Sequence, residues 1–396
     1  MEWKEVRLGD IADVQTGPFG SQLHKSDYIA EGIPCIMPTN IGPHLNLVVD
    51  GIAHVSEVDA NRLSRHLTEF GDIIYARRGD IEKCAYVTTN EEKWLCGTGC
   101  LKIRCKNEVN SRFIAYLLST AECKKWITGN AVGTTMLNLS KGILSNLPLI
   151  IPSLVDQRRI ASVLSSLDRK IELNNKINVD LEEMAQAIFK NWFVDFEPFK
   201  DGKFVDSELG MIPEGWKVGG LFDIAEIFDK KRKPLSGNVR EKMDKIYPYY
   251  GATSCMDYVD DYIFDGIYTL IGEDGSVVKE NGLPYMQYVW GKMWVNNHAH
   301  ILQGKNGYST EMIHALLSIT NIKFLVTGAV QAKLSQGNMQ KILVAIPPKN
   351  VLDEIRPVID NLYSKIRSLS DENSRLSLLR NTLLPRLMSG ELEVPE

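Results

Sequence analysis

The chain has 396 residues, of which 44% are hydrophobic and 24% are charged, and its formal net charge is −5. This composition is typical of a globular protein of two to four domains, and the acidic balance does not by itself indicate a nucleic-acid partner. The sequence lacks an apolar run long enough to cross a membrane and its charged N-terminus is unlike a signal peptide, so we expect a cytoplasmic protein.

Residues 1–152 are predicted to form a first globular domain of mixed α and β structure. Two segments resemble strands, Gly71–Ile81 and Cys100–Cys105. Ser111–Ile127 has the apolar spacing of an amphipathic helix, with Ser111 as its cap.

Residues 153–215 are predicted to form a helical spacer and a linker. Apolar and asparagine residues recur there at alternating steps of four and three, which is the seam of a coiled coil. The seam residues are Ile160, Leu164, Leu167, Ile171, Asn174, Asn178, Leu181, Ala185 and Ile188.

Residues 216–348 are predicted to form a second globular domain that repeats the first. Trp216 opens a segment similar to the one at Trp3, and internal repeats of this kind indicate duplication of one structural unit. The same order of elements follows. The expected strands and helix are Asp265–Val277, Trp294–Leu302 and Ser309–Ile319.

Residues 349–396 are predicted to form a second spacer helix, with Pro385 at its end. Its seam residues are Ile355, Ile359, Leu362, Ile366, Leu369, Asn373, Leu376, Arg380 and Leu383. Each of the two helices is about 35 residues long, well beyond an average globular helix. The alternative is a pair of ordinary amphipathic helices in a bundle.

Two such helices in one chain most simply pair with each other, and a pseudo-two-fold relation between the repeats makes the pair antiparallel. A helix of about 35 residues spans roughly 50 Å, while the half-sites of a dimeric DNA reader lie about 34 Å apart or a multiple of that. The pair is therefore long enough to act as a spacer on DNA. Asparagines at Asn174, Asn178 and Asn373 are expected to fix its register.

Motifs of catalysis and metal binding are missing. The sequence has neither a phosphate-binding loop nor a G-x-S-x-G elbow, and it lacks the Asn-Pro-Pro-aromatic loop of amino-methyltransferases. The seven cysteines form no C-x-x-C pair, and His298 and His300 share one strand face without an evident third ligand. We therefore predict a binding subunit with no catalytic residue, no metal and reduced cysteines in its core.

Candidate ligand contacts lie in polar loops, where Lys, Arg, Ser, Thr, Asn and Gln can bind phosphates or read base edges. The alternative for each loop is a solvated connection. The predicted DNA-binding residues are Ser21, Gln22, Lys25, Arg77, Arg78, Thr134, Thr135, Asn138, Lys230, Lys231, Arg232, Thr253, Ser276, Lys333 and Ser335. Arg77 and Arg78 align with Glu273 and Asp274, so the two domains are expected to prefer different bases.

Several motifs together resemble the specificity (S) subunit of type I restriction–modification systems, over the whole length of the chain. They are Gly-Pro-Phe-Gly-Ser at Gly17–Ser21, the helix start at Asn146–Asn174, the Asn-Trp-Phe-Val-Asp-Phe run within Ile188–Phe199, Leu209–Trp216, and the second-copy segment Leu270–Ser276.

The resemblance implies an α+β fold, with two similar target recognition domains separated by two long helices that form an antiparallel coiled coil. It implies that each domain reads one half of a bipartite DNA target, and that the helices dock two modification subunits. Those subunits would bind S-adenosylmethionine and methylate adenine N6, and restriction subunits would bring ATP and magnesium. Partner contacts are expected at Phe189, Trp192, Phe193 and Phe196. The second helix lacks this aromatic run, so the two docking surfaces are not equivalent.

We therefore predict a non-catalytic DNA-specificity subunit. Two alternatives remain at this stage: a methyltransferase or nuclease active by itself, and a coiled-coil adaptor for protein partners. The target bases, the spacer length and the surviving restriction activity are not readable from the sequence.

Overall fold

The computed structural model describes residues 3–133, 137–328 and 331–394. The chain divides into two compact units. Unit 1 comprises Met1–Glu172 with Asn373–Glu396, and unit 2 comprises Leu173–Glu372. Both are mixed α and β, which confirms the predicted fold class. The boundaries fall inside two long helices, so each unit combines one globular part with half of each helix.

Unit 1 has two four-stranded sheets, ordered β2-β9-β6-β7 and β3-β5-β4-β8, and a separate strand pair, β1-β10. Its strands are β1 (Lys4–Arg7), β2 (Ala12–Thr16), β3 (Tyr28–Ile29), β4 (Ile33–Ile36), β5 (Ala53–Val55), β6 (Ile73–Ala76), β7 (Cys84–Tyr86), β8 (Leu95–Cys96), β9 (Cys100–Cys105) and β10 (Pro148–Ile151). Its shorter helices are α1 (Leu8–Ile11), α2 (Glu57–Arg62), α3 (Ser111–Leu118), α4 (Ala121–Asn130) and α5 (Lys141–Ser145).

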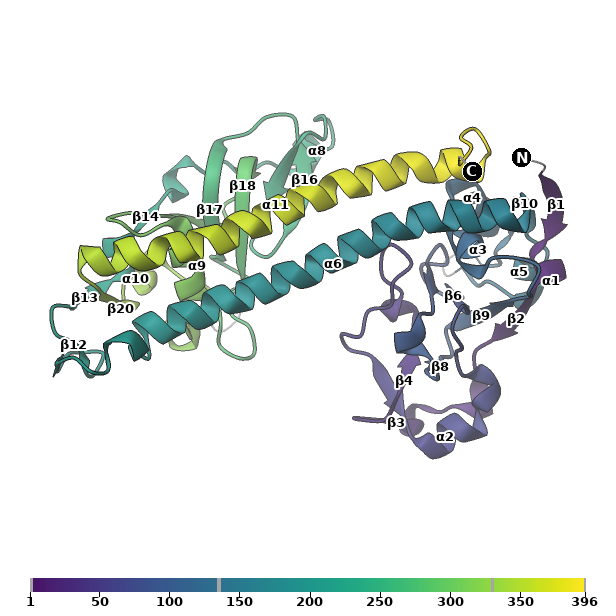
Figure 1. Cartoon of the computed structure of the whole chain (residues 1–396), viewed down its shortest axis with the longest axis horizontal. Helices are drawn as coiled ribbons and strands as arrows, with labels where there is room; N and C mark the ends of the chain where they lie inside the picture. Colours follow the sequence, from purple (N-terminus) through teal and green to yellow (C-terminus); the bar gives the residue numbers. More distant parts are fainter. Residues whose placement is uncertain (1–2, 134–136, 329–330, 395–396) are drawn as a thin grey trace. The chain divides into compact units, whose positions relative to one another are not determined.

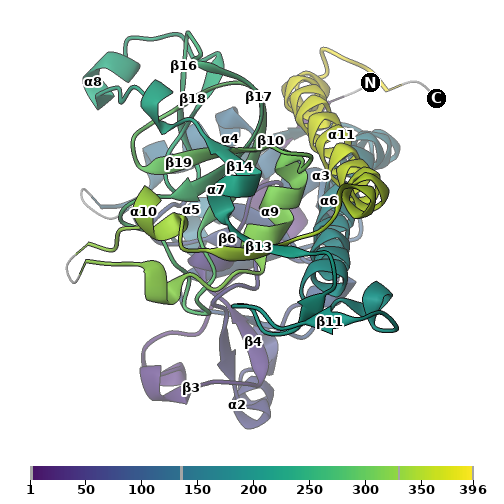
Figure 2. The ribbon, with the colours of Figure 1, turned by 90° about the vertical axis from the view of Figure 1, so that its left-hand side faces the viewer.

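Unit 2 gathers its strands into one six-stranded sheet, β14-β19-β17-β18-β15-β16, and two strand pairs, β11-β12 and β13-β20. Its strands are β11 (Phe204–Val205), β12 (Ile212–Pro213), β13 (Lys217–Gly220), β14 (Ala225–Ile227), β15 (Tyr247–Tyr250), β16 (Cys255–Val259), β17 (Phe264–Gly272), β18 (Met286–Val295), β19 (Ala299–Gly304) and β20 (Leu343–Ile346). Its shorter helices are α7 (Leu221–Ile224), α8 (Gly237–Arg240), α9 (Thr310–Ser318) and α10 (Gln336–Met339). Helix α9 packs against β17 and β19 (Figure 2).

The same strand framework occurs in both units, as the sequence repeat predicts. In unit 1, β1 pairs antiparallel with β10, the strand that precedes α6, and β2 pairs with the central strand β9. In unit 2, β13 pairs antiparallel with β20, the strand that precedes α11, and β14 pairs with the central strand β19. The matching residue pairs are Lys4–Ile151 with Lys217–Ile346, Ala12–Cys105 with Ala225–Gly304, and Tyr75–Leu101 with Ile271–His300.

Several predicted element bounds are wrong in detail. The helix expected over Ser111–Ile127 is two helices, because Thr120 caps a new start with its side chain, and the cap of α3 is Asn110 rather than Ser111. The strand expected over Trp294–Leu302 is interrupted by a turn between β18 and β19. The two strands expected over Gly71–Ile81 and Asp265–Val277 end early, at Ala76 and Gly272, where turns begin.

The two long helices are α6 (Leu154–Phe193) and α11 (Lys349–Met388), teal and yellow in Figure 1. All the predicted seam residues are buried or half-buried, which confirms the periodic seam. Pro385 does not end α11, because a proline in the last turn removes only one main-chain bond, and the helix continues to Met388.

Polar contacts between α6 and α11 run in opposite chain directions, which confirms an antiparallel pairing in both units. In unit 1, Arg380 Nε lies 2.8 Å from Asp168 Oδ1. In unit 2, Asn174 donates to Glu372 at 2.8 Å, and Asn178 donates to the Ser370 hydroxyl at 3.0 Å. In unit 1, Asn373 donates to the carbonyl of Ile171 at 3.4 Å. Such polar seam residues specify register and orientation.

Each unit has its own hydrophobic core, and helix halves contribute to both. Ile160, Leu164 and Leu387 belong to the core of unit 1, whereas Ala185 and Ile359 belong to that of unit 2. Helices and domains are therefore fixed to one another by buried apolar surface within each unit. Among the described residues, we find no helix with both the length and the apolar character that a membrane crossing needs.

Candidate nucleic-acid interface

In unit 1, the turn after β6 lies against the segment that precedes α5. The backbone N–H of Leu139 donates to the Arg77 carbonyl at 2.9 Å, and Arg78 forms an antiparallel bridge with Asn138. The Arg77 guanidinium lies 5.5 Å from the centre of the Phe19 ring, a cation–π distance. Burial, followed by repulsion from Arg78, lowers the pKa of Arg77. The two arginines and Asn138 therefore lie next to one another at this turn.

In unit 2, the turn after β17 lies against the segment that precedes α10. The N–H of Leu334 donates to the Glu273 carbonyl at 2.8 Å, and Asp274 forms an antiparallel bridge with Lys333. His298, in the turn before β19, accepts at its carbonyl from the Glu273 N–H at 2.8 Å, and its ring Nδ1 lies 2.5 Å from Asp274 Oδ1.

The two turns occupy equivalent positions on the same framework. The strand registers above place Arg77 with Glu273, and the bridges place Arg78 with Asp274 and Asn138 with Lys333. The predicted alignment of the two turns is therefore confirmed. Unit 1 presents arginine where unit 2 presents a carboxylate, on a backbone that makes the same contacts.

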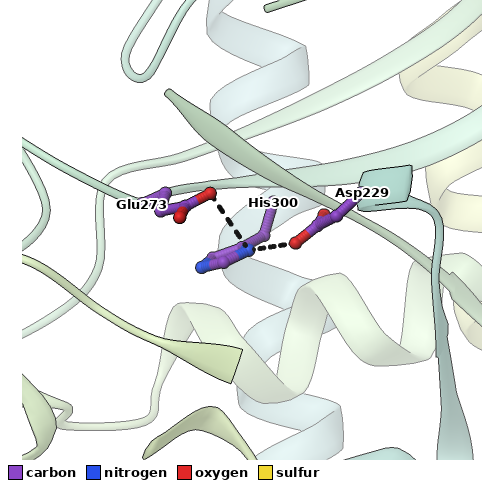
Figure 3. Close-up of side chains that lie close together, drawn as sticks. All are labelled: Asp229, Glu273 and His300. Atoms are coloured by element: carbon purple, nitrogen blue, oxygen red, sulfur yellow. Dashed lines mark hydrogen bonds and ion pairs between the residues drawn. The ribbon is translucent and has the colours of Figure 1, made fainter. Parts of the chain in front are cut away.

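Beneath the turn of unit 2 lies a buried ion cluster with His300 at its centre (Figure 3). His300 Nδ1 lies 2.6 Å from Asp229 Oδ2 and 3.7 Å from Glu273 Oε2. Its Nε2 lies 2.7 Å from the carbonyl oxygen of Leu334. The ring is 1% exposed. Both ring nitrogens therefore lie within hydrogen-bond distance of protein oxygen atoms.

Arg232 closes the other side of this cluster. Its guanidinium donates to Glu273 at 2.7 Å and to the carbonyls of Ala299 at 2.7 Å and Asn297 at 3.3 Å. Burial alone would raise the pKa of Asp229, but hydrogen bonding and charge from His300, with Arg232 behind them, lower it. Asp229 is therefore ionised at neutral pH. Arg232 and His300 thus lie against the two carboxylates of the cluster.

Asp229, Glu273 and His300 each offer one atom within 4.8 Å of the others, a spacing that a metal ion could use. The chemistry of the donors does not fit a metal. A histidine ligand needs a free, unprotonated nitrogen, whereas both nitrogens of His300 already lie within 2.7 Å of protein oxygens, and Arg232 holds the Glu273 carboxylate. We therefore interpret the trio as an ion-pair cluster.

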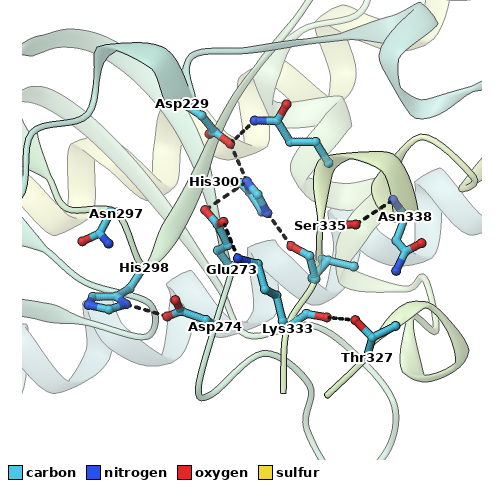
Figure 4. A network of polar contacts seen from close by, with 12 residues as sticks. Asp229, Glu273, Asp274, Asn297, His298, His300, Thr327, Lys333, Ser335 and Asn338 are labelled. Carbon is cyan, nitrogen blue, oxygen red and sulfur yellow. Dashed lines mark hydrogen bonds and ion pairs between the residues drawn. The ribbon is translucent and has the colours of Figure 1, made fainter. Parts of the chain in front are cut away.

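Figure 4 shows how this cluster supports the exposed surface next to it. Asp274, His298 and Lys333 lie on the exposed side of the cluster, below it in this view, with 23%, 47% and 54% of their side chains exposed. Lys333 also reaches Glu273 at 3.6 Å. We define Asp274, His298 and Lys333 as the upper surface of unit 2.

The other predicted DNA-binding residues are distributed over several loops. The following are exposed: Ser21, Lys25, Arg78, Lys230, Lys231, Thr253, Ser276 and Lys333. Gln22 and Asn138 are half-buried, as is Ser335, whose hydroxyl caps α10. Thr134 and Thr135 lie outside the described residues. Arg232 needs correction, because its side chain is only 12% exposed and is committed to the ion cluster.

The predicted partner-binding aromatics also need correction. Phe189 and Phe193 are 2% and 5% exposed and stack on each other with centroids 4.4 Å apart, so they are core residues of unit 2. Phe196 packs edge-on against Trp216 at 5.2 Å. Trp192 and Phe196 remain half-buried. The aromatic run thus joins α6 to the start of the second globular domain.

Sequence reasoning missed the roles of Asp229 and Glu273. They are separated from His300 by 71 and 27 positions, so no local spacing pairs them. The alternation of His298 and His300 predicted that both side chains share one face of a strand, but it did not identify the partners of either side chain. In the structure His300 is buried in the cluster, whereas His298 is exposed beside Asp274.

The framework and its duplication agree with comparisons to known proteins. Residues 1–183 and 213–377 match the family described as "Type I restriction modification DNA specificity domain". The chain therefore belongs to this family, which supports the prediction of a non-catalytic specificity subunit and does not favour the two alternatives.

Individual relatives extend over nearly the whole chain. The type I restriction enzyme MjaIX specificity subunit of Methanocaldococcus jannaschii is 27% identical over 100% of this chain and 94% of its own length. The HindI specificity subunit of Haemophilus influenzae is 24% identical over 99% and 100%. The crystal structure of the S subunit from M. genitalium has the same fold, with a TM-score of 0.59, 17% identity, and coverage of 98% and 96%.

Proposed function

We propose that each unit reads one half of a bipartite DNA sequence, and that the turns at Arg77–Arg78 and Glu273–Asp274 carry part of this reading. One observation supports the proposal most directly: the two turns are equivalent in backbone and opposite in charge. A duplicated scaffold that keeps its backbone and changes exposed side chains suits the reading of two different base sequences.

The side chains indicate which bases each turn would favour. Arginine donates well to the O6 and N7 acceptors of guanine, whereas a carboxylate accepts from the N4 amino group of cytosine. Arg78 would therefore favour guanine in the half-site of unit 1. Asp274 would favour cytosine in the half-site of unit 2.

The paired helices α6 and α11 would set the distance between the half-sites. Both are continuous through both units, and polar seam contacts fix their register. One heptad adds about 10 Å of helix, which corresponds to about three base pairs. Insertion of one heptad after Glu172 and another after Glu372 should therefore lengthen the tolerated gap.

The chemistry would be supplied by partners. We propose that two modification subunits bind S-adenosylmethionine and methylate adenine N6 after flipping the base out of the duplex, and that restriction subunits bring ATP and magnesium. These partners would also share the phosphate contacts, which suits a chain with a net charge of −5. A cytoplasmic location belongs to the same proposal.

Mapping of methylated adenines in a host that carries this chain with its modification subunits tests the reading. We expect a two-part motif with an unspecified centre. Arg78→Ala should relax one half of it and Asp274→Asn the other, whereas the control Glu183→Gln, at an exposed position on α6, should change neither. An undivided motif in the wild-type complex would count against the proposal. So would a methylated motif that neither Arg78→Ala nor Asp274→Asn changes.

A further inference from the structure

The positions beneath the two turns differ more than the turns themselves. His300 in unit 2 is equivalent to Leu101 in unit 1, since each pairs with the corresponding residue of the central strand. By the same register, Asp229 is equivalent to Thr16, two residues beyond the matching pairs Ile227–Leu302 and Val14–Ile103. Leu101 is fully buried among apolar residues.

An apolar residue is thus sufficient to support this turn in unit 1. Burying ions is expensive, and a buried ion pair often stabilises a fold less than well-packed apolar side chains do. The ion cluster of unit 2 is therefore not explained by a requirement of the shared framework. Its contacts indicate another role.

The cluster ties together the segments that carry the upper surface. His300 holds the carbonyl of Leu334, next to Lys333. Arg232 holds the carbonyls of Asn297 and Ala299, on either side of His298, and it also holds the side chain of Glu273, next to Asp274. Asp229 accepts from Gln336 of α10 at 2.6 Å, so a further segment is attached.

We propose that the Asp229–His300 pair is a positioning device that decides how Asp274, His298 and Lys333 are presented to DNA, and that it thereby determines the sequence choice of unit 2 without touching a base. This inference rests on the proposed function. Glu273 is not a base reader, because its carboxylate is engaged by Arg232, His300 and Lys333.

The test replaces the Asp229–His300 pair with the residues at the equivalent positions of unit 1. The paired variant Asp229→Thr/His300→Leu removes both polar side chains at once, so neither is left buried without its partner. The complete methylating complex is assembled with this variant, and methylation is measured on duplexes that carry every single-base change in either half-site.

We expect the variant complex to methylate the original site. Discrimination against wrong bases should fall at least about fivefold in the half read by unit 2, the size of a small single-mismatch penalty. Discrimination in the other half should be unchanged. The matched control is Glu311→Gln, which alters another buried carboxylate of unit 2 whose partners are Arg367 and Tyr288, and it should leave both halves unchanged.

A second variant covers the case in which the paired variant does not fold. Asp229→Asn keeps the shape of the side chain but weakens its hold on the His300 ring, and it should relax the same half-site to a smaller degree. A folded variant that retains full discrimination in both halves overturns the inference, as does an equal loss of methylation at all sites.

Failure of the inference can be told apart from failure of the proposed function. If Arg78→Ala and Asp274→Asn relax separate halves but the paired variant does not, only the positioning role is wrong. If the wild-type complex methylates no two-part sequence, the proposed function itself fails.

Discussion

The two units solve one structural problem in different ways. In both units a turn is held by the same backbone hydrogen bond. The N–H of Leu139 donates to the Arg77 carbonyl in unit 1, and the N–H of Leu334 donates to the Glu273 carbonyl in unit 2. At the equivalent position below the turn, unit 1 has the buried apolar side chain of Leu101, whereas unit 2 has His300, which contacts the Leu334 carbonyl. The shared fold therefore requires this backbone hydrogen bond, but it does not require one particular type of side chain below the turn.

The consequence is that stability and recognition are coupled differently in the two units. An apolar support is non-directional, so exposed residues above it can change independently. An ion cluster is directional, and a change in one member leaves another charge buried. Unit 2 should therefore tolerate fewer changes around its turn than unit 1 does.

The largest expected effect comes from breaking the cluster of unit 2 on one side. Asp229→Ala removes the buried carboxylate that faces both Arg232 and His300, and we expect a loss of about 3–5 kcal/mol in the free energy of unfolding. Thr16→Ala, the equivalent change in unit 1, should cost about 1 kcal/mol or less. Urea unfolding of both variants measures the difference. Equal costs would show that the two supports do not differ.

The same carboxylate gives an acid dependence. The pKa of Asp229 is lowered in the folded state, so the unfolded chain binds more protons, and stability is lost as pH falls below the usual value near 3.8 and through the folded pKa. This part of the acid loss should be absent in Asp229→Ala. The free energy of unfolding of both proteins is measured between pH 5 and pH 2, in steps of about half a pH unit. If it falls equally in both, Asp229 is not the source of this acid loss.

The next effect concerns recognition. Arg78→Ala should cost about 1–3 kcal/mol of discrimination at one base position in the half-site of unit 1. Competition binding by the assembled complex measures it, with duplexes changed one base at a time. The charge-keeping Arg78→Lys should restore affinity but not the preference for guanine, because lysine lacks the two-pronged donor geometry. A loss of affinity in Arg78→Ala that is equal for all duplexes and is fully restored by lysine would indicate a phosphate contact instead.

A smaller effect is expected from the exposed lysines Lys230 and Lys231. If they contact phosphates, each alanine substitution should weaken binding to all sequences equally and should reduce the slope of log affinity against log salt by about 1. Lys341→Ala, an exposed lysine beside α10, is the control. An unchanged salt slope would remove both lysines from the contact surface.

The smallest effect concerns the reactivity of the cysteine thiols, which differs between the two units. The seven cysteines are free, and six of them lie in unit 1, where burial raises the pKa of Cys35, Cys84, Cys96 and Cys105 to about 12. Cys255 of unit 2 is exposed. A maleimide at pH 7 should therefore label Cys255 first, and Cys255→Ser should remove the fast phase without affecting stability. Rapid labelling of several thiols would contradict the burial in unit 1.

Part of this architecture could be predicted from local patterns. The heptad positions identified the seam of α6 and α11, and Asn174 and Asn178 proved to bond across it, because a helix places residues three and four apart on one face. Elements that depend on a single capping residue were less predictable. Helix α3 ends at Leu118 and Thr120 caps the start of α4, although a single helix was expected through this point.

The candidate interface was predictable only as a set of loops. Exposed Arg78 and Lys333 were identified from residue type, but no sequence pattern placed Arg232 in the interior. A buried arginine looks the same as an exposed one until its acceptors are known, and those acceptors lie 41 and 67 positions away, at Glu273 and Ala299.

The sequence by itself determined the duplication, the helical seam and the membership of a specificity family, because each of these is written in residues close together in the chain or repeated along it. Only the tertiary structure decided that Asp229, Glu273 and His300 meet, that Phe189 and Phe193 form core, and that Leu101 and His300 are equivalent. Strand pairing brings distant residues into contact at atomic distances, and the resulting desolvation and hydrogen bonds assign each side chain its role.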